Sequence, residues 1–578
     1  MSTSFFERSE LAEVLASFRR EFLWVGFFSM VANVLMLTPT LYMLQVFDRV
    51  LASQSELTLL FLSLIVFVFF CTMAFADWIR SRILVRAGVR LDQKLNLRIF
   101  NASFESYLKL IHKNPTQAFS DLTNLRQFLT GNGIIAFFDI PWTPIYILVI
   151  FLMHPFLGAL SIIFVVIQIA ITYYGEYRGK GINESLTLAE SKSRSYLHSK
   201  LKNAEPVEAM GMLNNLRASW IRLHTDELAQ MSVVIKGQKS QQAFAKFIRY
   251  SMQSLTLGAA ALLVIEGELS VGAMIAANVL MTRALQPLDL ISGSWKGFLQ
   301  AKVAFIDLEM LLKTFPDRDG SIQYPTPTGL VSLKKLTATT ANRMKPILQG
   351  LTLDFRPGQV TVVIGPSGSG KSTLARCLVG IWPDFSGQVL IDETPIELWD
   401  REQLGPCVGY LPQDVELFEG TIAENISRFN EVDSEKVIEA AQHAGIHDMI
   451  LRFPMGYDTP IGEAGMSLSG GQRQRLGLAR AMYGNPSIIV LDEPNSNLDE
   501  HGERALVQAI KTLKAQKKSI ILITHRLNIL GAADYLLALE DGKVAHYGIR
   551  DEVIETINKQ AKSNKNAIPV NDSGLKPA

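Results

Sequence analysis

Long apolar runs dominate the first half of this 578-residue chain and are rare in its second half. The clearest is LTLLFLSLIVFVFFCTMAFADWI at 57–79. Each run is close to the roughly 20 residues that an α-helix needs to cross the apolar core of a bilayer. The pattern therefore predicts six membrane-spanning helices. They are expected near 23–46, 57–79, 133–153, 155–174, 250–266 and 270–290.

The segments that join these runs differ in length and charge. Two of them, 80–132 and 175–243, are long, repeatedly basic and poor in Gly and Pro, so the helices are expected to continue through them. The short links at 47–56 and 266–270 contain only Arg49 as a Lys or Arg residue. Since basic loops stay on the cytoplasmic side, we expect both long segments and both termini in the cytosol.

Two ionisable residues lie within or at the margin of the apolar runs. Asp139 and Arg283 would be costly to place in a bilayer, and such groups often line a transport pathway. They are candidates for the substrate path. The alternative is that Asp139 lies at the membrane surface and that the long Arg283 side chain reaches the membrane surface from within the bilayer.

The pattern changes after about residue 312. The segment TFPDRDGSIQYPTPTG at 314–329 is rich in turn residues. Beyond it, short β-branched runs such as VTVVIG alternate with helical stretches, which predicts an α/β domain with a mostly parallel sheet. We therefore expect a cytosolic segment at 1–22, an all-α membrane domain at 23–311, a linker at 312–330, an α/β domain at 331–560 and a disordered tail at 561–578.

Composition supports a membrane protein and gives no sign of a nucleic-acid partner. Hydrophobic residues make up 48% of the chain and charged residues 19%, while the formal net charge is only +1. A protein that binds nucleic acid shows a basic footprint, which this balance does not provide. The three cysteines, Cys71, Cys377 and Cys407, have no metal-ligand or paired spacing, so a reducing compartment is expected.

A phosphate-binding loop follows the strand-like run at 360–364. The sequence GPSGSGKST at 365–373 fits the P-loop pattern, in which glycines let backbone N–H groups surround phosphates at a helix start. Lys371 is expected to contact the β- and γ-phosphates of ATP, and Ser372 to bind Mg²⁺. The predicted ATP-binding residues are Gly365, Pro366, Ser367, Gly368, Ser369, Gly370, Lys371, Ser372 and Thr373.

Further polar residues follow other apolar strands. Asp492 and Glu493 end SIIVLDE, and we expect Asp492 to hold Mg²⁺ and Glu493 to polarise an attacking water. Gln413 and His525 also come directly after apolar stretches, where a doubly wound sheet presents its ligands. His525 is the candidate for a contact with the γ-phosphate.

Taken in order, the P-loop, Gln413, LSGGQ (468–472), IIVLDE (488–493), NLD (497–499) and His525 resemble the nucleotide-binding domain of an ATP-binding cassette (ABC) transporter. With six spans before them, the whole chain resembles an ABC exporter half-transporter. The resemblance implies a homodimer with two shared ATP sites, because the chain has one P-loop and one LSGGQ. It also implies that Gln413 senses Mg²⁺.

The resemblance assigns LSGGQ to the nucleotide of the other subunit. Glycine amides and the Ser469 hydroxyl at a helix start would form a second anion-binding site, and Asp499 would lie at the dimer seam. The residues implied to bind ATP in trans are Ser469, Gly470, Gly471, Gln472 and Asp499. One departure concerns adenine: such exporters place an aromatic residue before the P-loop, whereas Thr340 is the closest match here.

A finer resemblance lies in 38–59, 84–92 and 408–426, which are similar to the type I secretion exporters of Gram-negative bacteria, in the branch that exports proteases and lipases. It implies an unfolded protein substrate with a C-terminal signal. It also implies a periplasmic membrane-fusion adaptor, an outer-membrane tunnel protein and a place in the inner membrane.

Two other functions are weighed against this one. An ABC exporter of lipid or small hydrophobic molecules fits the spans and the motifs equally well, and only the finer resemblance disfavours it. A soluble ABC-type ATPase acting on DNA or ribosomes is disfavoured by the apolar runs and by the neutral charge balance.

Overall fold

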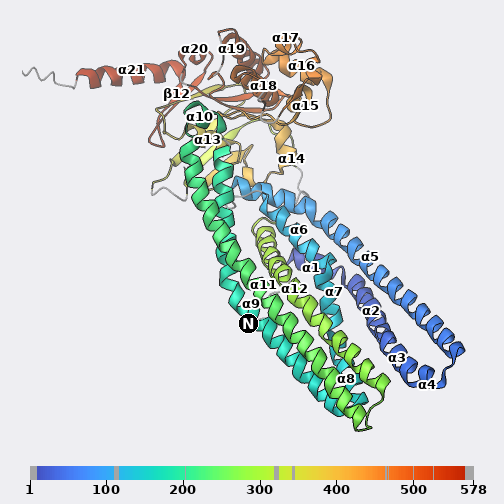
Figure 1. Cartoon of the computed structure of the whole chain (residues 1–578). Coiled ribbons are helices and arrows are strands. Elements are labelled where there is room, and N and C mark those ends of the chain that lie inside the picture. Colours follow the sequence, from blue (N-terminus) through green and yellow to red (C-terminus); the bar gives the residue numbers. More distant parts are fainter. Residues whose placement is uncertain are drawn as a thin grey trace, which may run out of the picture. The chain divides into compact units, whose positions relative to one another are not determined.

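The computed structural model describes residues 9–109, 116–201, 203–317, 324–340, 345–462, 465, 468–496, 498, 500–524 and 526–566. The chain divides into two compact units (Figure 1). One comprises 1–103 and 114–316, and the other comprises 104–113 and 317–578.

The described part of the first unit is helical. Its α-helices are α1 (Glu10–Ala16), α2 (Arg19–Leu35), α3 (Thr38–Gln45), α4 (Leu51–Ser53), α5 (Glu56–Leu108), α6 (Gln117–Thr130), α7 (Asn132–Asp139), α8 (Thr143–Met153), α9 (Pro155–Leu201), α10 (Ala204–Ala209), α11 (Leu213–Ile265) and α12 (Val271–Thr314). A π-helical turn (Val46–Val50) and a 3₁₀ turn (Ile140–Trp142) interrupt the series. As expected, α5, α9 and α11 continue far beyond their apolar parts into the basic segments.

Five helical stretches of the described chain are long and apolar enough to cross a membrane. They are Arg19–Ser53, Glu56–Leu108, Asn132–Met153, Pro155–Gly175 and Leu213–Ile265. In the apolar part of α5 only 11% of residues are buried within the unit, so its large side chains face outwards, as a bilayer requires. The protein is therefore a membrane protein.

The sixth predicted run, 270–290, lies on α12, which is not among these five stretches. Its first half carries small residues that are fully buried, such as Ala276, Ala277 and Ala284. This helix packs against α3, α6, α7, α8, α9 and α11, so it lies inside the bundle. A helix surrounded by other helices needs less apolar surface than one that faces lipid, and the count of six spans stays a prediction.

The second unit is built around a six-stranded sheet in the order β12-β11-β3-β10-β9-β6. The neighbouring strands from β11 to β6 are parallel, and β12 is antiparallel to β11. These strands are β3 (Val360–Ile364), β6 (Val408–Leu411), β9 (Ile488–Asp492), β10 (Ser519–Ile523), β11 (Tyr535–Glu540) and β12 (Lys543–Ile549). A second sheet has the order β2-β1-β4-β5, with β1 (Val331–Ala338), β2 (Leu348–Phe355), β4 (Phe385–Ile391) and β5 (Thr394–Pro395).

The remaining elements of this unit are mainly helices. They are α13 (Lys371–Leu378), α14 (Arg401–Leu404), α15 (Ile422–Ile426), α16 (Ser434–His443), α17 (His447–Ile450), α18 (Gly470–Met482), α19 (Glu500–Ala515), α20 (Leu527–Leu530) and α21 (Arg550–Asn566), with the short pair β7 (Gly420–Thr421) and β8 (Pro460–Ile461). The mostly parallel α/β domain is thus confirmed.

Successive residues along each central strand of the six-stranded sheet belong to two different hydrophobic cores. Val490 and Ile521 pack with Leu374 of α13 and with β1, β2 and β4. Their chain neighbours Leu491 and Leu522 pack instead with α16, α18 and α19. Because side chains alternate between the faces of a strand, these cores lie on opposite faces of the sheet. The helix after the P-loop and the helix after LSGGQ are therefore on opposite faces.

The ends of the expected domains can be compared with the structure. The division between the units falls at 316/317, inside the expected linker, and α12 enters that linker by three residues to end at Thr314. Helix α21 continues to Asn566, so 561–566, expected to be disordered, are helical. No Gly or Pro stands between Arg550 and Asn566 to end this helix earlier. The rest of the expected tail, 567–578, lies outside the described residues.

Candidate functional site

Four parallel strands bring the predicted site residues to one edge of the sheet. The strands β3, β10, β9 and β6 are adjacent and parallel, so their carboxyl ends lie at the same edge. The P-loop follows β3, Gln413 follows β6, and Glu493 follows β9. His525 comes just after β10 but lies outside the described residues, as does Asp499.

The P-loop has a backbone that only glycine can adopt easily. Gly365, Gly368 and Gly370 have φ values of +155°, +82° and +99°. A Cβ atom on Gly365 would lie 2.3 Å from the carbonyl oxygen of Leu539, so a side chain cannot be placed there without a shift. Helix α13 begins directly after Gly370, which leaves the unpaired N–H groups of its first turn at the loop. The loop therefore has the geometry of an anion cradle.

Lys371 points back into this loop. Its Nζ donates hydrogen bonds to the carbonyl oxygens of Gly365 and Pro366, at 2.9 and 2.8 Å. Burial lowers the pKa of the Lys371 ammonium, while the nearby Glu493 and Asp492 carboxylates act in the opposite direction. Within the described chain, the buried Ser369 hydroxyl has no hydrogen-bond partner. A bound phosphate would supply acceptors for both groups, so these residues fit ATP.

Asp492 is the last residue of β9 and is 2% exposed. Burial raises the pKa of its carboxyl group, against a hydrogen bond from Ser372 that lowers it, and the Glu493 charge raises it further. Its Oδ1 has no hydrogen-bond partner among the described residues. A buried carboxylate beside a hydroxyl is the kind of hard oxygen pair that Mg²⁺ prefers, so these two residues fit the metal.

Glu493 and Gln413 meet next to this pair. Gln413 Nε2 donates to Glu493 Oε2 at 3.3 Å. Glu493 has a left-handed backbone with φ of +48°, and its N–H donates to the Ile523 carbonyl at 2.9 Å. A φ of this kind in a non-glycine residue costs of order 1–3 kcal/mol and concentrates at functional sites. The structure thus brings four of the candidate site residues together: Lys371, Asp492, Glu493 and Gln413.

The LSGGQ segment forms the start of α18. Ser469 is its N-cap: Ser469 Oγ accepts from the Gln472 N–H at 3.3 Å, and Gln472 Oε1 accepts from the Ser469 N–H at 2.8 Å. Ser469 is exposed. Gly470 and Gly471 form the first turn, so their N–H groups are available for an anion. The Gln472 side chain has a local role in this capping box, which the sequence analysis did not foresee.

The expected adenine position holds no aromatic side chain of its own. Thr340 lies two residues after the end of β1, and 341–344 lie outside the described residues. The Trp382 indole N–H donates to the Thr339 carbonyl at 3.1 Å. Sequence reasoning missed this tryptophan because the pairing of β1 with β4, far apart in the chain, is what brings it there.

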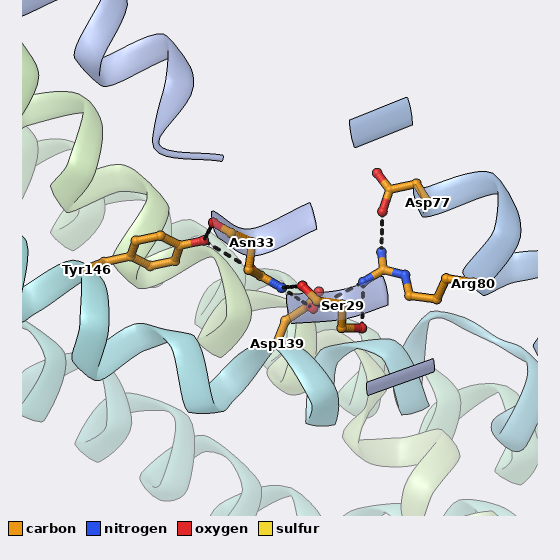
Figure 2. A network of polar contacts seen from close by, with 6 residues as sticks. All are labelled: Ser29, Asn33, Asp77, Arg80, Asp139 and Tyr146. Carbon is orange, nitrogen blue, oxygen red and sulfur yellow. Dashed lines mark hydrogen bonds and ion pairs between the residues drawn. The ribbon is translucent and has the colours of Figure 1, made fainter. Parts of the chain in front are cut away.

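The two charged residues of the apolar runs are both paired. Figure 2 shows Asp139 in a network that joins α2, α5, α7 and α8. Asp139 Oδ1 accepts from Asn33 Nδ2 at 2.7 Å and from Arg80 Nη1 at 3.1 Å, while the Tyr146 hydroxyl donates to the Asn33 carbonyl at 2.9 Å. Arg283 donates to Gln286 on its own helix at 3.0 Å. These contacts give Asp139 a structural role between helices.

Family comparisons agree with the two-unit architecture. Residues 22–288 match the ABC transporter transmembrane region, and residues 348–496 match the ABC transporter family. The chain is 40% identical over 99% of its length, and over 98% of the relative's, to the type I secretion system ATP-binding protein PrsD of Rhizobium meliloti. It is 28% identical to the leukotoxin translocation ATP-binding protein LktB of Mannheimia haemolytica, over 94% of this chain and 77% of the relative.

A solved structure shares the fold. A bacterial Atm1-family ABC exporter with ATP bound superposes with a TM-score of 0.79 and 21% sequence identity, covering 96% of this chain and 100% of the other. The family matches agree with the membrane helices and with the assembled phosphate site. The chain belongs to the ABC exporters of type I secretion systems, and it is a membrane protein whose ATPase activity is coupled to transport.

Proposed function

We propose that this exporter moves an unfolded protein with a C-terminal signal across the bacterial inner membrane, driven by ATP. The observation that carries the ATPase part is the meeting of Lys371, Asp492, Glu493 and Gln413 at one sheet edge. The protein cargo is supported by the relatives, whose names describe type I secretion and leukotoxin translocation.

Within the site, each residue has a proposed task. Residues 365–373 hold the phosphates, with Lys371 turned from its two carbonyl partners towards the β- and γ-phosphates. Ser372, Asp492 and Gln413 hold Mg²⁺, which supplies charge neutralisation at the phosphates. Glu493 orients and polarises the attacking water, and His525 contacts the γ-phosphate. Phosphoryl transfer needs mainly positioning and charge stabilisation, so these contacts suffice for hydrolysis.

The working unit is a homodimer with two shared sites. Ser469, Gly470, Gly471 and Gln472 at the start of α18 face the ATP held by the partner's P-loop, together with Asp499. Support comes from the two cores, which put α13 and α18 on opposite faces of one sheet. The exposed start of α18, with the N–H groups of its first turn unpaired, would bind the phosphates of the partner's ATP.

The assembly includes two further proteins. A periplasmic membrane-fusion adaptor and an outer-membrane tunnel protein would continue the path beyond the inner membrane. The basic segments 80–132 and 175–243 would lie in the cytosol with both termini. The motifs and the membrane helices fit export of lipid or small hydrophobic molecules equally, so the cargo requires its own test.

The test is ATPase stimulation of the purified, reconstituted full-length chain. A peptide from the C-terminal signal of a protein cargo should raise kcat several-fold, and a scrambled peptide of equal composition should not. Stimulation by added lipid, with no response to any C-terminal signal peptide, would instead support the lipid exporter. The same measurement with Glu493→Gln gives the background without hydrolysis.

A further inference from the structure

Glu493 has a backbone that must be held in place by its surroundings. Its left-handed φ of +48° is uncommon for a residue with a side chain. Two main-chain bonds contribute: its N–H donates to the Ile523 carbonyl at 2.9 Å, and its own carbonyl accepts the Ser496 N–H at 3.2 Å. Both come from the strand beside Glu493 and the turn that follows it.

A third bond comes from another part of the fold. Gln474, on α18, donates from Nε2 to the Glu493 carbonyl oxygen at 3.2 Å. Its side chain is 2% exposed, so this amide has been removed from water. Burying an amide is costly unless it forms hydrogen bonds, and the bond to Glu493 is therefore a specific one.

Helix α18 packs closely against β6 and the segment after it because Gly477 has no side chain at the point of contact. A Cβ atom there would lie 2.7 Å from Val415 Cγ1 and 2.9 Å from Leu411 Cδ1. One turn further on, Arg480 Nη2 donates to the Glu416 carbonyl at 3.0 Å. One helix thus contacts both the segment after Gln413 and the backbone of Glu493.

We infer that Gln474 is a positioning residue for ATP hydrolysis, which links the start of α18 to the backbone of the catalytic glutamate. The inference rests on the proposed roles of Glu493 and Ser469. Gln474 follows Ser469 by little more than one helical turn, and the capping box fixes the start of this helix. Movement of Ser469 on the partner's ATP is therefore carried to Glu493. Through this link, each chain sets its own glutamate according to whether the other site is filled.

The test compares three full-length variants by steady-state ATPase activity and nucleotide binding. Gln474→Leu removes the donor at similar volume, and kcat should fall about ten- to hundredfold, as for a catalytic group misplaced by about 1 Å. The Kd for a fluorescent ATP analogue should not change, because the hydrogen bond from Gln474 goes to the Glu493 backbone and not to the P-loop. Gln508→Leu is the matched control: it makes the same change at an exposed position of α19 and should leave kcat unchanged.

Gln474→Glu provides a readout that lost folding would not produce. A carboxyl group donates to the Glu493 carbonyl only when it is protonated, so the kcat of this variant relative to the parent should rise as pH falls. The ratio for Gln474→Leu, whose side chain cannot be protonated, should stay flat. Parental kcat in Gln474→Leu, or a flat ratio for Gln474→Glu, overturns the inference. An active Glu493→Gln variant would instead contradict the proposed function.

Discussion

One buried aspartate in each unit has a different set of hydrogen-bond partners. In the nucleotide-binding unit, Asp492 Oδ1 and Ser369 Oγ are buried without hydrogen-bond partners among the described residues. In the membrane unit, Asp139 already has the Arg80 guanidinium and the Asn33 amide on one oxygen (Figure 2). Buried polar groups are normally paired, so the open set, Asp492 and Ser369 at the phosphate loop, fits a bound ligand, while the paired set around Asp139 joins helices. The difference separates a site that binds from a network that holds helices together.

The largest expected effect is at the catalytic glutamate of the nucleotide-binding unit. Glu493→Gln should bind ATP with unchanged affinity and lower kcat about a hundredfold or more, because an amide cannot accept a proton from water. Phosphate release and equilibrium binding of a fluorescent ATP analogue measure the two effects. Near-normal turnover would remove Glu493 from its role.

The paired set should respond in stability. Asp139→Ala removes the acceptor that Arg80 and Asn33 share, while Asp77 stays as a second carboxylate partner of Arg80, so the free energy of unfolding should fall by ~2 kcal/mol, as for leaving buried donors unpaired. The thermal unfolding temperature of the detergent-solubilised protein should fall, while ATPase activity well below that temperature persists.

The matched control is Arg82→Met. It removes an exposed arginine from α5, the helix that carries Arg80, and should leave the unfolding temperature unchanged. Unchanged stability in Asp139→Ala, together with altered export of one cargo over another, would return Asp139 to the substrate path.

A smaller effect concerns pH. Burial raises the pKa of Asp492, so its carboxylate is protonated at a pH above the ordinary value of 3.8. The raised pKa means that the folded protein disfavours the carboxylate form of Asp492. Because Mg²⁺ binds this carboxylate form, a proton and Mg²⁺ compete for the group. The affinity of the ATP-loaded protein for Mg²⁺ should therefore weaken several-fold as pH falls towards that raised pKa. Titration with Mn²⁺ as a spectroscopic probe measures it, and Asp492→Asn should show weak binding without this pH dependence.

Sequence reasoning succeeded where chemistry is encoded locally. The P-loop and the acidic strand end of Asp492 are contiguous in the chain, and parallel pairing of their strands made their meeting predictable. The Asp139–Arg80 pair, the Gln474 bond to Glu493 and the position of Trp382 each join distant segments, so no local pattern contained them. The apolar run at 270–290 was ambiguous for the related reason that buried alanines, rather than large side chains, fill the centre of a bundle.

The claim that two chains share each ATP site is tested most directly by mixed dimers. One chain carries Lys371→Ala and the other Ser469→Arg, and occluded ATP is counted per dimer. If the sites are shared, one site loses both elements and the other keeps both. The account predicts one occluded ATP per dimer, on the chain with intact Lys371. Equal loss of ATP from both sites would contradict it, because every site would then contain one defect of its own.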